Sequence, residues 1–522
     1  MTPPDAPATL QSGLGNHQHP IATKNPEAQR FFDQGLTLVY GFNHDEAVRA
    51  FRKAADLDPQ EPMPWWGIAL AVGPNYNQDV DPEHEKAAID AIRKAQSLEA
   101  NAPQNERDYV EALARRYSND PKPDLKKLAV DYKNAMGDLS KRYPDDLDAA
   151  TIYAESMMDL RPWNLWTLDG KPAEDTVEIV NVLQSVLKRD PMHVGANHYY
   201  IHAVEASPHP EDALISAQRL ETLVPAAGHL VHMPAHIYER TGNYAGAVEA
   251  NEAGAKADRS FLAATKAEGG MYDLMYYSHN LHFLAMAASM EGKSADATAA
   301  AAKLAAHVTP GIKQMGMLEQ FLPMQQFMLV RFQKWNDVLN LPAPDPSFAM
   351  TSAFWHYSRG VAFAATKDAG KAAAERKDLA DAAAKQPADA MFGYNPARSV
   401  MNVAIETLDA RIAEAQGDRS SAIAHWQKAV AADDALAYDE PADWYYPTRE
   451  SLGGAYLRGA QYDEAEKVFR TDLEKNPRNP RSLFGLYKAL DGQKKTAAAD
   501  SIRQQFDQAW KNADVQLRID DL

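Results

Sequence analysis

The feature that most constrains the fold of this chain is a pattern of small residues that recurs near both of its ends. Gly35 is followed by Ala47 after 12 residues, and Ala47 by Pro59 after another 12. The same two intervals separate the glycine, alanine and proline at positions 453, 465 and 477. Small residues let two helices cross closely, and a proline ends a helix because it lacks the backbone donor. The pattern therefore predicts an all-α chain of repeated, antiparallel helix pairs, and we see no alternation that would predict a sheet.

The same intervals continue through the middle of the chain with one interruption. Ala213 precedes Pro225 by 12 residues, and Ala247 follows Ala213 by 34. Ala297 comes 50 residues after Ala247, which predicts an insertion of about 16 residues near 258–275. The segment LPAPDP at 341–346 is the best candidate for a boundary. We therefore expect a flexible tail over 1–24, an N-terminal solenoid over 25–340, and a C-terminal solenoid with capping helices over 347–522.

Composition excludes several classes of function. A formal net charge of −18 argues against nucleic acid as a partner, because phosphate binding needs clustered lysine and arginine. The absence of cysteine excludes disulfides, thiolate zinc sites, thiol nucleophiles and iron–sulfur clusters. No run approaches the roughly 18 apolar residues of a membrane span. The chemistry must come from other side chains.

Histidines concentrate in the centre of the chain, where nine of the sixteen lie within residues 193–282. Their distances from the alanines at 213, 247 and 297 repeat at offsets of 18, 15 and 11 residues, which place them on one stripe of a helix. Imidazoles three or four residues apart on a helix can share a metal ion. The candidate metal ligands are His198, His202, His229, His232, His236, His279 and His282.

Packing is the alternative explanation for these histidines, and the outer repeats provide an internal control. The residue 15 positions before the alanine is Phe32 in the first repeat and Glu450 in the last, so the repeat itself does not require histidine there. Three histidines in register therefore favour a shared site. We interpret the histidines at 193, 209, 307, 356 and 425 as packing or surface residues. His17 and His19 belong to the expected tail, where any metal binding would be adventitious.

The ligand types indicate a class of metal. Imidazole nitrogen suits copper or zinc, with iron as a further option, whereas calcium and magnesium prefer oxygen ligands. Glu205 lies one turn beyond His202 and is the candidate catalytic residue: it can ligate, orient a ligand or act as general base on metal-bound water. The sequence leaves open whether one ion or two are bound.

The 34-residue unit resembles the tetratricopeptide repeat (TPR), and the resemblance covers most of residues 26–517. It implies an α-solenoid of helix-turn-helix repeats whose first helices line a concave groove, so that the histidine stripe would face a single cavity. Three functions remain open. The first is a metalloenzyme, hydrolytic or oxidative, acting on a small-molecule or peptide-like ligand in the groove. The second is a non-catalytic adaptor for a protein or peptide partner, and the third is metal storage or delivery.

A narrower resemblance is to a widespread bacterial set of TPR proteins. It rests on HYYIHAVEASPHPEDAL at 198–214, GHLVHMPAHIYERTGNY at 228–244 and HNLHFLAMAASMEG at 279–292, and extends to HPIATKNPEAQRFFDQG, FNHDEA, GPNYN and DLRPWNLW. Such proteins often begin with an export signal, and a chain without cysteine suits an oxidising compartment. We therefore favour a periplasmic or exported location. The N-terminus lacks a basic-then-apolar stretch, so a cytoplasmic location stays open.

Overall fold

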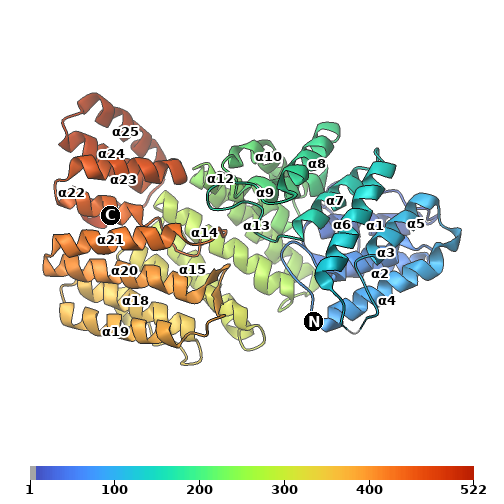
Figure 1. Ribbon diagram of the computed structural model, residues 1–522, viewed down its shortest axis with the longest axis horizontal. Helices are drawn as coiled ribbons and strands as arrows, with labels where there is room; N and C mark the ends of the chain where they lie inside the picture. The colour runs from blue at the N-terminus through green and yellow to red at the C-terminus, as the bar shows by residue number, and fades with distance from the viewer. Residues whose placement is uncertain (1–7, 121) are drawn as a thin grey trace. The chain divides into compact units, whose positions relative to one another are not determined.

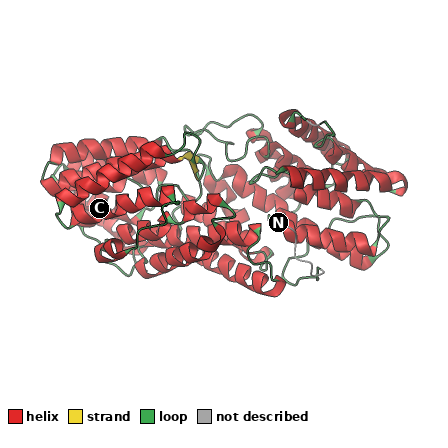
Figure 2. Ribbon diagram, turned by 90° about the horizontal axis from the view of Figure 1, so that it is seen from below, coloured by secondary structure: helices red, strands yellow, loops and turns green. Residues whose placement is uncertain are grey.

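The computed structural model describes residues 8–120 and 122–522 (Figures 1 and 2). The chain divides into two compact units. The first contains the described residues up to Ile237 together with Glu252–Tyr277, and the second contains Tyr238–Asn251 and Ser278–Leu522. The boundary expected at 341–346 is therefore not where the units separate, because that segment joins two helices inside the second unit.

The first unit consists of helices and the turns between them. Its α-helices are α1 (Pro26–Tyr40), α2 (His44–Leu57), α3 (Met63–Val72), α4 (Pro82–Leu98), α5 (Gln104–Ala114), α6 (Leu125–Arg142), α7 (Leu147–Met158), α8 (Thr176–Arg189), α9 (Val194–Val204), α10 (Leu214–Leu223) and α11 (Gly228–His232). Short 3₁₀ turns lie at η1 (Glu99–Asn101) and η2 (Pro210–Ala213), and a π-helical turn at η3 (Tyr272–Tyr277). Helices α12 (Pro234–Arg240) and α13 (Tyr244–Thr265) contribute residues to both units.

The second unit continues the same architecture. Its α-helices are α14 (Ser278–Glu291), α15 (Ser294–Val308), α16 (Pro323–Arg331), α17 (Trp335–Asn340), α18 (Ala349–Ala365), α19 (Ala369–Lys385), α20 (Ala397–Gln416), α21 (Arg419–Asp434), α22 (Arg449–Arg458), α23 (Tyr462–Lys475), α24 (Pro480–Gly492) and α25 (Thr496–Ala509). Its 3₁₀ turns are η4 (Thr309–Gly311), η5 (Gly316–Phe321) and η6 (Ile519–Asp521). Over the described residues, the only strands are β1 (Met391–Phe392) and β2 (Asn395–Pro396), which pair antiparallel.

The repeat pattern is explained by one phenylalanine in each terminal repeat. The ring of Phe51 on α2 lies between Gly35 on α1 and Gly67 on α3, and a Cβ atom at either glycine would come within 2.6 Å of it. Phe469 on α23 lies in the same way between Gly453 on α22 and Gly485 on α24. Glycine is required because any side chain would overlap the ring. The all-α solenoid of helix-turn-helix repeats is thereby confirmed.

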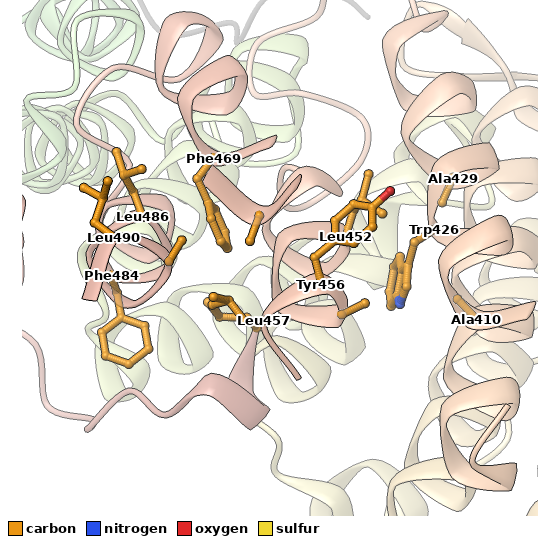
Figure 3. Close-up of a cluster of buried hydrophobic side chains, with 14 of the residues drawn as sticks. Ala410, Trp426, Ala429, Leu452, Tyr456, Leu457, Phe469, Phe484, Leu486 and Leu490 are labelled. Atoms are coloured by element: carbon orange, nitrogen blue, oxygen red, sulfur yellow. The ribbon is translucent and has the colours of Figure 1, made fainter. Parts of the chain in front are cut away.

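The core of the last repeat is built around this ring. Phe469 is fully buried and packs in a cluster that includes Leu457, Leu486 and Leu490 (Figure 3). Burying a side chain of this size contributes about 1.5–3 kcal/mol. No described helix is both long and apolar enough to cross a membrane.

Residues 8–24 correct the expectation of a flexible tail over 1–24. Leu14 and Ile21 are buried, and the backbone N–H of Gln11 donates to the Gln34 side chain at 2.8 Å. The N–H of Ala226, before α11, donates to the carbonyl of Gly13 at 2.9 Å. The segment forms no helix, and these hydrogen bonds join it to residues elsewhere in the unit. Residues 1–7 lie outside the described part.

The predicted insertion near 258–275 takes two forms. It extends α13 to 22 residues, and it adds the turn η3 before α14. The two parts meet where the Tyr272 hydroxyl donates to Asp258 at 2.7 Å.

Candidate metal centre

Five of the predicted ligands lie on two neighbouring helical stretches of the first unit. His198 and His202 lie on α9, whereas His229 and His232 lie on α11. Pro234 begins α12 directly after α11 because it has no N–H to continue the ladder. His236 lies on α12, four residues after His232. None of these five imidazoles is more than 2% exposed.

Three imidazoles converge through the same ring atom. The Nε2 atom of His198 lies 3.0 Å from Nε2 of His202 and 3.2 Å from Nε2 of His229. All three ligand atoms lie within 4.8 Å of one another. This group, which we call the three-histidine centre, contains three of the seven ligands that the register of the sequence predicted.

The other ring nitrogens determine where the protons are. Nδ1 of His198 is 2.6 Å from the carbonyl oxygen of Tyr40, which can only accept, so this nitrogen carries the proton. Nδ1 of His202 is 2.8 Å from Oε1 of Glu205 and donates to that carboxylate. In the neutral rings both Nε2 atoms are therefore unprotonated, and their lone pairs face each other across 3.0 Å. A cation between them removes this repulsion.

A proton is a poor candidate for that cation. Burial and the neighbouring His202 lower the pKa of His198 well below its usual value. Burial also lowers the pKa of His202, although Glu205 opposes the shift. Both rings therefore resist protonation near neutral pH, and the arrangement suits a metal ion instead.

Glu205 connects this centre to a second histidine pair. Its Oε2 atom accepts from Nδ1 of His236 at 2.5 Å, and Nε2 of His236 lies 2.9 Å from Nε2 of His232. Burial opposes ionisation of Glu205, but His236 and His202 outweigh it and lower its pKa to about 2. A carboxylate with both oxygens engaged by ligand imidazoles orients those rings. Three roles were expected for Glu205: metal ligand, orientation of a ligand, and general base. The geometry favours orientation of the His202 and His236 rings.

Aromatic side chains from distant parts of the sequence surround the imidazoles. Phe42 has its ring centroid 4.6 Å from that of His198 and 5.4 Å from that of His229. Tyr76 and Trp163 lie 5.4 and 5.7 Å from His202, again between centroids. These three residues belong to the FNHDEA, GPNYN and RPWNLW segments. Sequence reasoning missed their role, and the only signal was the presence of these segments in the family resemblance.

The inserted segment also contacts the centre. The Tyr276 ring on η3 lies 5.0 Å from His229 between centroids, and the backbone N–H of His229 donates to the Tyr272 hydroxyl at 3.2 Å. The Tyr272 hydroxyl in turn donates to Asp258. The insertion therefore supports the start of α11 rather than forming a separate loop.

A second cluster of imidazoles surrounds Asp148 on α7. Its two carboxylate oxygens lie 3.0 Å from Nε2 of His17 and 2.9 Å from Nδ1 of His19. Nε2 of His193 is 3.3 Å away. Burial opposes ionisation of Asp148, but His17 and then His19 and His193 hold its pKa well below the usual range. The interpretation of His17 and His19 as tail residues is thereby corrected.

The carboxylate of Asp148 accounts for the arrangement of these imidazoles, although their ligand atoms also lie close enough together to hold an ion. Nδ1 of His193 accepts the backbone N–H of Ala196 at 3.2 Å as the N-cap of α9, so the neutral ring carries its proton on Nε2, which faces Asp148. The cluster reaches the three-histidine centre through Tyr40. The Tyr40 hydroxyl donates to Asp148 at 2.6 Å, while its carbonyl, at the end of α1, accepts from His198.

The remaining two predicted ligands lie in the second unit. His279 and His282 are half-buried on α14. Burial lowers the pKa of His282 to about 4. Their participation in metal binding stays a prediction from the register.

Comparison with known proteins bears on the fold. A tetratricopeptide-repeat family model matches residues 448–481, which contain α22 and α23. No curated protein matches the chain. Similar solved structures include the human IFIT1 dimer with m7Gppp-AAAA, which is 12% identical with a TM-score of 0.37 over 94% of this chain and 96% of that one. The Cut9–Hcn1 hetero-tetramer of APC/C is 12% identical with a TM-score of 0.30 over 94% and 95%. The TPR domain of P58(IPK) is 11% identical with a TM-score of 0.22 over 90% and 99%. At these identities and TM-scores none of them carries an argument about this chain.

Proposed function

We propose that this chain, a protein of tetratricopeptide-type repeats, binds a transition metal ion through His198, His202 and His229. One observation carries the proposal: the Nε2 atoms of His198 and His202 are 3.0 Å apart although both rings hold their proton on Nδ1, which donates it in a hydrogen bond to an oxygen acceptor. Bringing two buried lone pairs together without a cation would be unfavourable.

The spacing suits an ion of the zinc or copper class. Ligand nitrogens at 2.0–2.1 Å from a tetrahedral ion are about 3.3 Å from one another. The Nε2 separations of 3.0 and 3.2 Å are close to that edge length. Imidazole ligands favour copper by affinity, while zinc or iron can win by availability. The acceptors on the Nδ1 atoms of His198 and His202 are those that metal-ligating histidines usually have.

The ligand set favours catalysis over a purely structural role. Three protein ligands leave one position open for water or substrate, as in catalytic zinc sites, whereas structural sites are closed by four. When bound, such an ion would supply an activated water or a redox centre. We therefore infer a metalloenzyme that carries out hydrolysis or oxidation on a small or peptide-like substrate. Glu205 would hold His202 and His236 in place, and Phe42, Tyr76 and Trp163 would exclude bulk water.

A non-catalytic adaptor is the second candidate function, and the repeat fold favours it. TPR-type solenoids offer a groove in which a peptide or partner protein can bind. An adaptor does not explain why the buried imidazoles of His198 and His202 face each other through lone pairs. Storage or delivery of a metal would use the same ligands without an open position.

Metal content tests the proposal directly. Protein purified without a histidine tag is loaded with Zn²⁺ or Cu²⁺, freed of excess ion and analysed for bound metal. We expect at least one ion per chain, with the His202→Ala variant losing it while remaining folded by circular dichroism. His425→Ala is the matched control, because His425 is also bonded to a glutamate (Glu406, 2.7 Å) but lies outside the centre.

Two results would count against the proposal. One is a wild-type chain that retains no ion at micromolar metal, and the other is equal retention by the His202→Ala and His425→Ala variants. The adaptor would then be the better account. The variants His279→Ala and His282→Ala report separately whether α14 contributes ligands.

A further inference from the structure

A cavity in the second unit is lined by an unusual number of arginines. It has a volume of about 330 Å³, within the range of small-molecule sites. Arg331, Arg411, Arg458 and Arg481 line it from α16, α20, α22 and α24. None of these residues belongs to the three-histidine centre, so the inference is independent of the proposed function.

Three of the four guanidinium groups have carboxylate partners. Arg331 donates to both oxygens of Glu450, at 2.5 and 3.0 Å. Arg411 and Arg458 share Glu414, at 3.1 and 2.6 Å. Arg411 and Arg458 also donate to the main-chain oxygen of Leu522, at 3.4 and 3.3 Å.

Arg481 has no carboxylate partner among the described residues. It donates to two backbone carbonyls, those of Asp521 at 2.8 Å and Arg331 at 3.3 Å. Its Nε–H, like that of Arg331, is buried without any acceptor. Arg481 is only 4% exposed, and a buried charge without a counter-ion is costly. Burial, together with the neighbouring Arg331, lowers the pKa of Arg481 to about 9.

Glu450 and Asp521 attract Arg481 electrostatically, but neither carboxylate is hydrogen-bonded to it. The Asp521 side chain accepts from Arg518, at 2.8 Å from its guanidinium, and Asp520 is exposed. Arg481 therefore lines the cavity as a buried guanidinium that has no carboxylate bonded to it and an Nε–H without an acceptor. An oxyanion matches both, because a guanidinium donates to carboxylate or phosphate through paired N–H groups.

The rest of the lining is aromatic and apolar. The hydroxyls of Tyr357 and Tyr445 lie 2.9 Å apart, and the Arg331 guanidinium lies 5.2 Å from the centroid of the Tyr446 ring. Val361 and Ala364 complete one wall. We propose that this cavity binds a small molecule with a carboxylate or phosphate head, held by Arg481 and Arg331, and an aromatic or apolar body packed against the tyrosines.

The experiment uses three probes of similar shape on the full chain. Benzoate and phenyl phosphate carry the two possible heads, and benzamide is neutral. Calorimetric titration is expected to detect binding of at least one anionic probe and none of benzamide. The stronger anionic probe identifies the head. Arg481→Gln is expected to weaken its binding by about tenfold or more, because a charged hydrogen bond is lost.

Two further variants keep the test decisive. Arg449→Gln is the control. Arg449 lies on α22 like Arg458, but it is outside the cavity and pairs with Asp434. Ala365→Phe fills the cavity from an exposed position, so it is expected to block binding without disturbing the core even if Arg481→Gln does not fold. The proposal is overturned if neither anion binds at millimolar concentration. It is equally overturned if Ala365→Phe and Arg449→Gln bind the anion alike.

Discussion

Glu205 and Glu239 occupy the same place in consecutive repeats, but their surroundings shift their pKa values in opposite directions. Glu205 is held ionised by His236 and His202, with its pKa lowered to about 2. Burial raises the pKa of Glu239 to about 8, against the opposing effect of Arg240. The register of the sequence cannot distinguish the two residues, because the difference comes from what lies next to each in space.

This contrast yields a prediction at the residue scale. Glu205→Gln keeps the shape of the side chain but removes the charge that orients His202 and His236, so metal affinity should fall by about 10- to 100-fold. Glu239→Gln should have little effect, because burial raises the pKa of Glu239 to about 8 and so favours its neutral form at pH 7. Competition with a chromophoric chelator measures both affinities. Equal losses in the two variants would show that Glu205 does not act through the imidazoles.

Tyr40 provides a second residue-scale prediction. Its hydroxyl bonds Asp148 while its carbonyl bonds His198, so Tyr40→Phe should loosen His198 and weaken metal binding by up to about tenfold. Tyr109→Phe is the matched control, since Tyr109 is equally buried and donates to Asp146 at 2.8 Å without contacting a ligand. The spectrum of the Co²⁺-loaded protein should change only in Tyr40→Phe. If both variants behave alike, the bond to Asp148 serves stability alone.

At the residue scale, the histidines were predictable and their surroundings were not. His198, His202 and His229 follow from the helical period and the repeat length, which are local properties. Phe42 and Asp148 reach the same region from other repeats, and they do not occupy the register position that the histidines share. His17 and His19 could not be assigned because an irregular segment has no period that would reveal its partners.

At the scale of elements, the contact between a phenylalanine and two glycines determines how closely successive helices approach. Fixed intervals in the sequence identified Gly35 and its equivalent near the other end, Gly453. The second glycine of each set, at 67 and 485, was not identified. The turn η3 was not predicted either. The repeat intervals give the length of the insertion, but they do not say which of its residues extend α13 and which form a turn.

Gly485 allows a prediction about this packing. A Cβ atom there would lie 2.1 Å from the ring of Phe469, so Gly485→Ala should destabilise the last repeats by about 1–3 kcal/mol through overpacking. Gly316→Ala is the control, because no atom lies within 4 Å of its Cβ position. The urea midpoint, followed by circular dichroism, compares the two. A Gly485→Ala midpoint equal to that of Gly316→Ala would mean that the ring can move aside at no cost.

At the scale of the whole molecule, the three-histidine centre belongs to one compact unit and the arginine-lined cavity to the other. The sequence suggested a division at 341–346 because proline-rich segments often separate domains. The actual units follow packing. The chain crosses between them within α12, within α13 and again between Tyr277 and Ser278, and no composition change marks these positions. Each unit therefore has its own candidate ligand, and the effects of the two ligands can be separated experimentally.

Hydrogen–deuterium exchange provides that separation. An ion that binds only the folded state stabilises it by about 4 kcal/mol at a concentration 1,000 times its dissociation constant. The protection should appear in α9 and α11, whose histidines bind the ion, and in the end of α1, whose Tyr40 carbonyl bonds His198. Helices α20 to α23 carry no proposed metal ligand, so their exchange should not change. Protection that appears equally in both sets would indicate that the ion acts on the chain as a whole and not at the three-histidine centre.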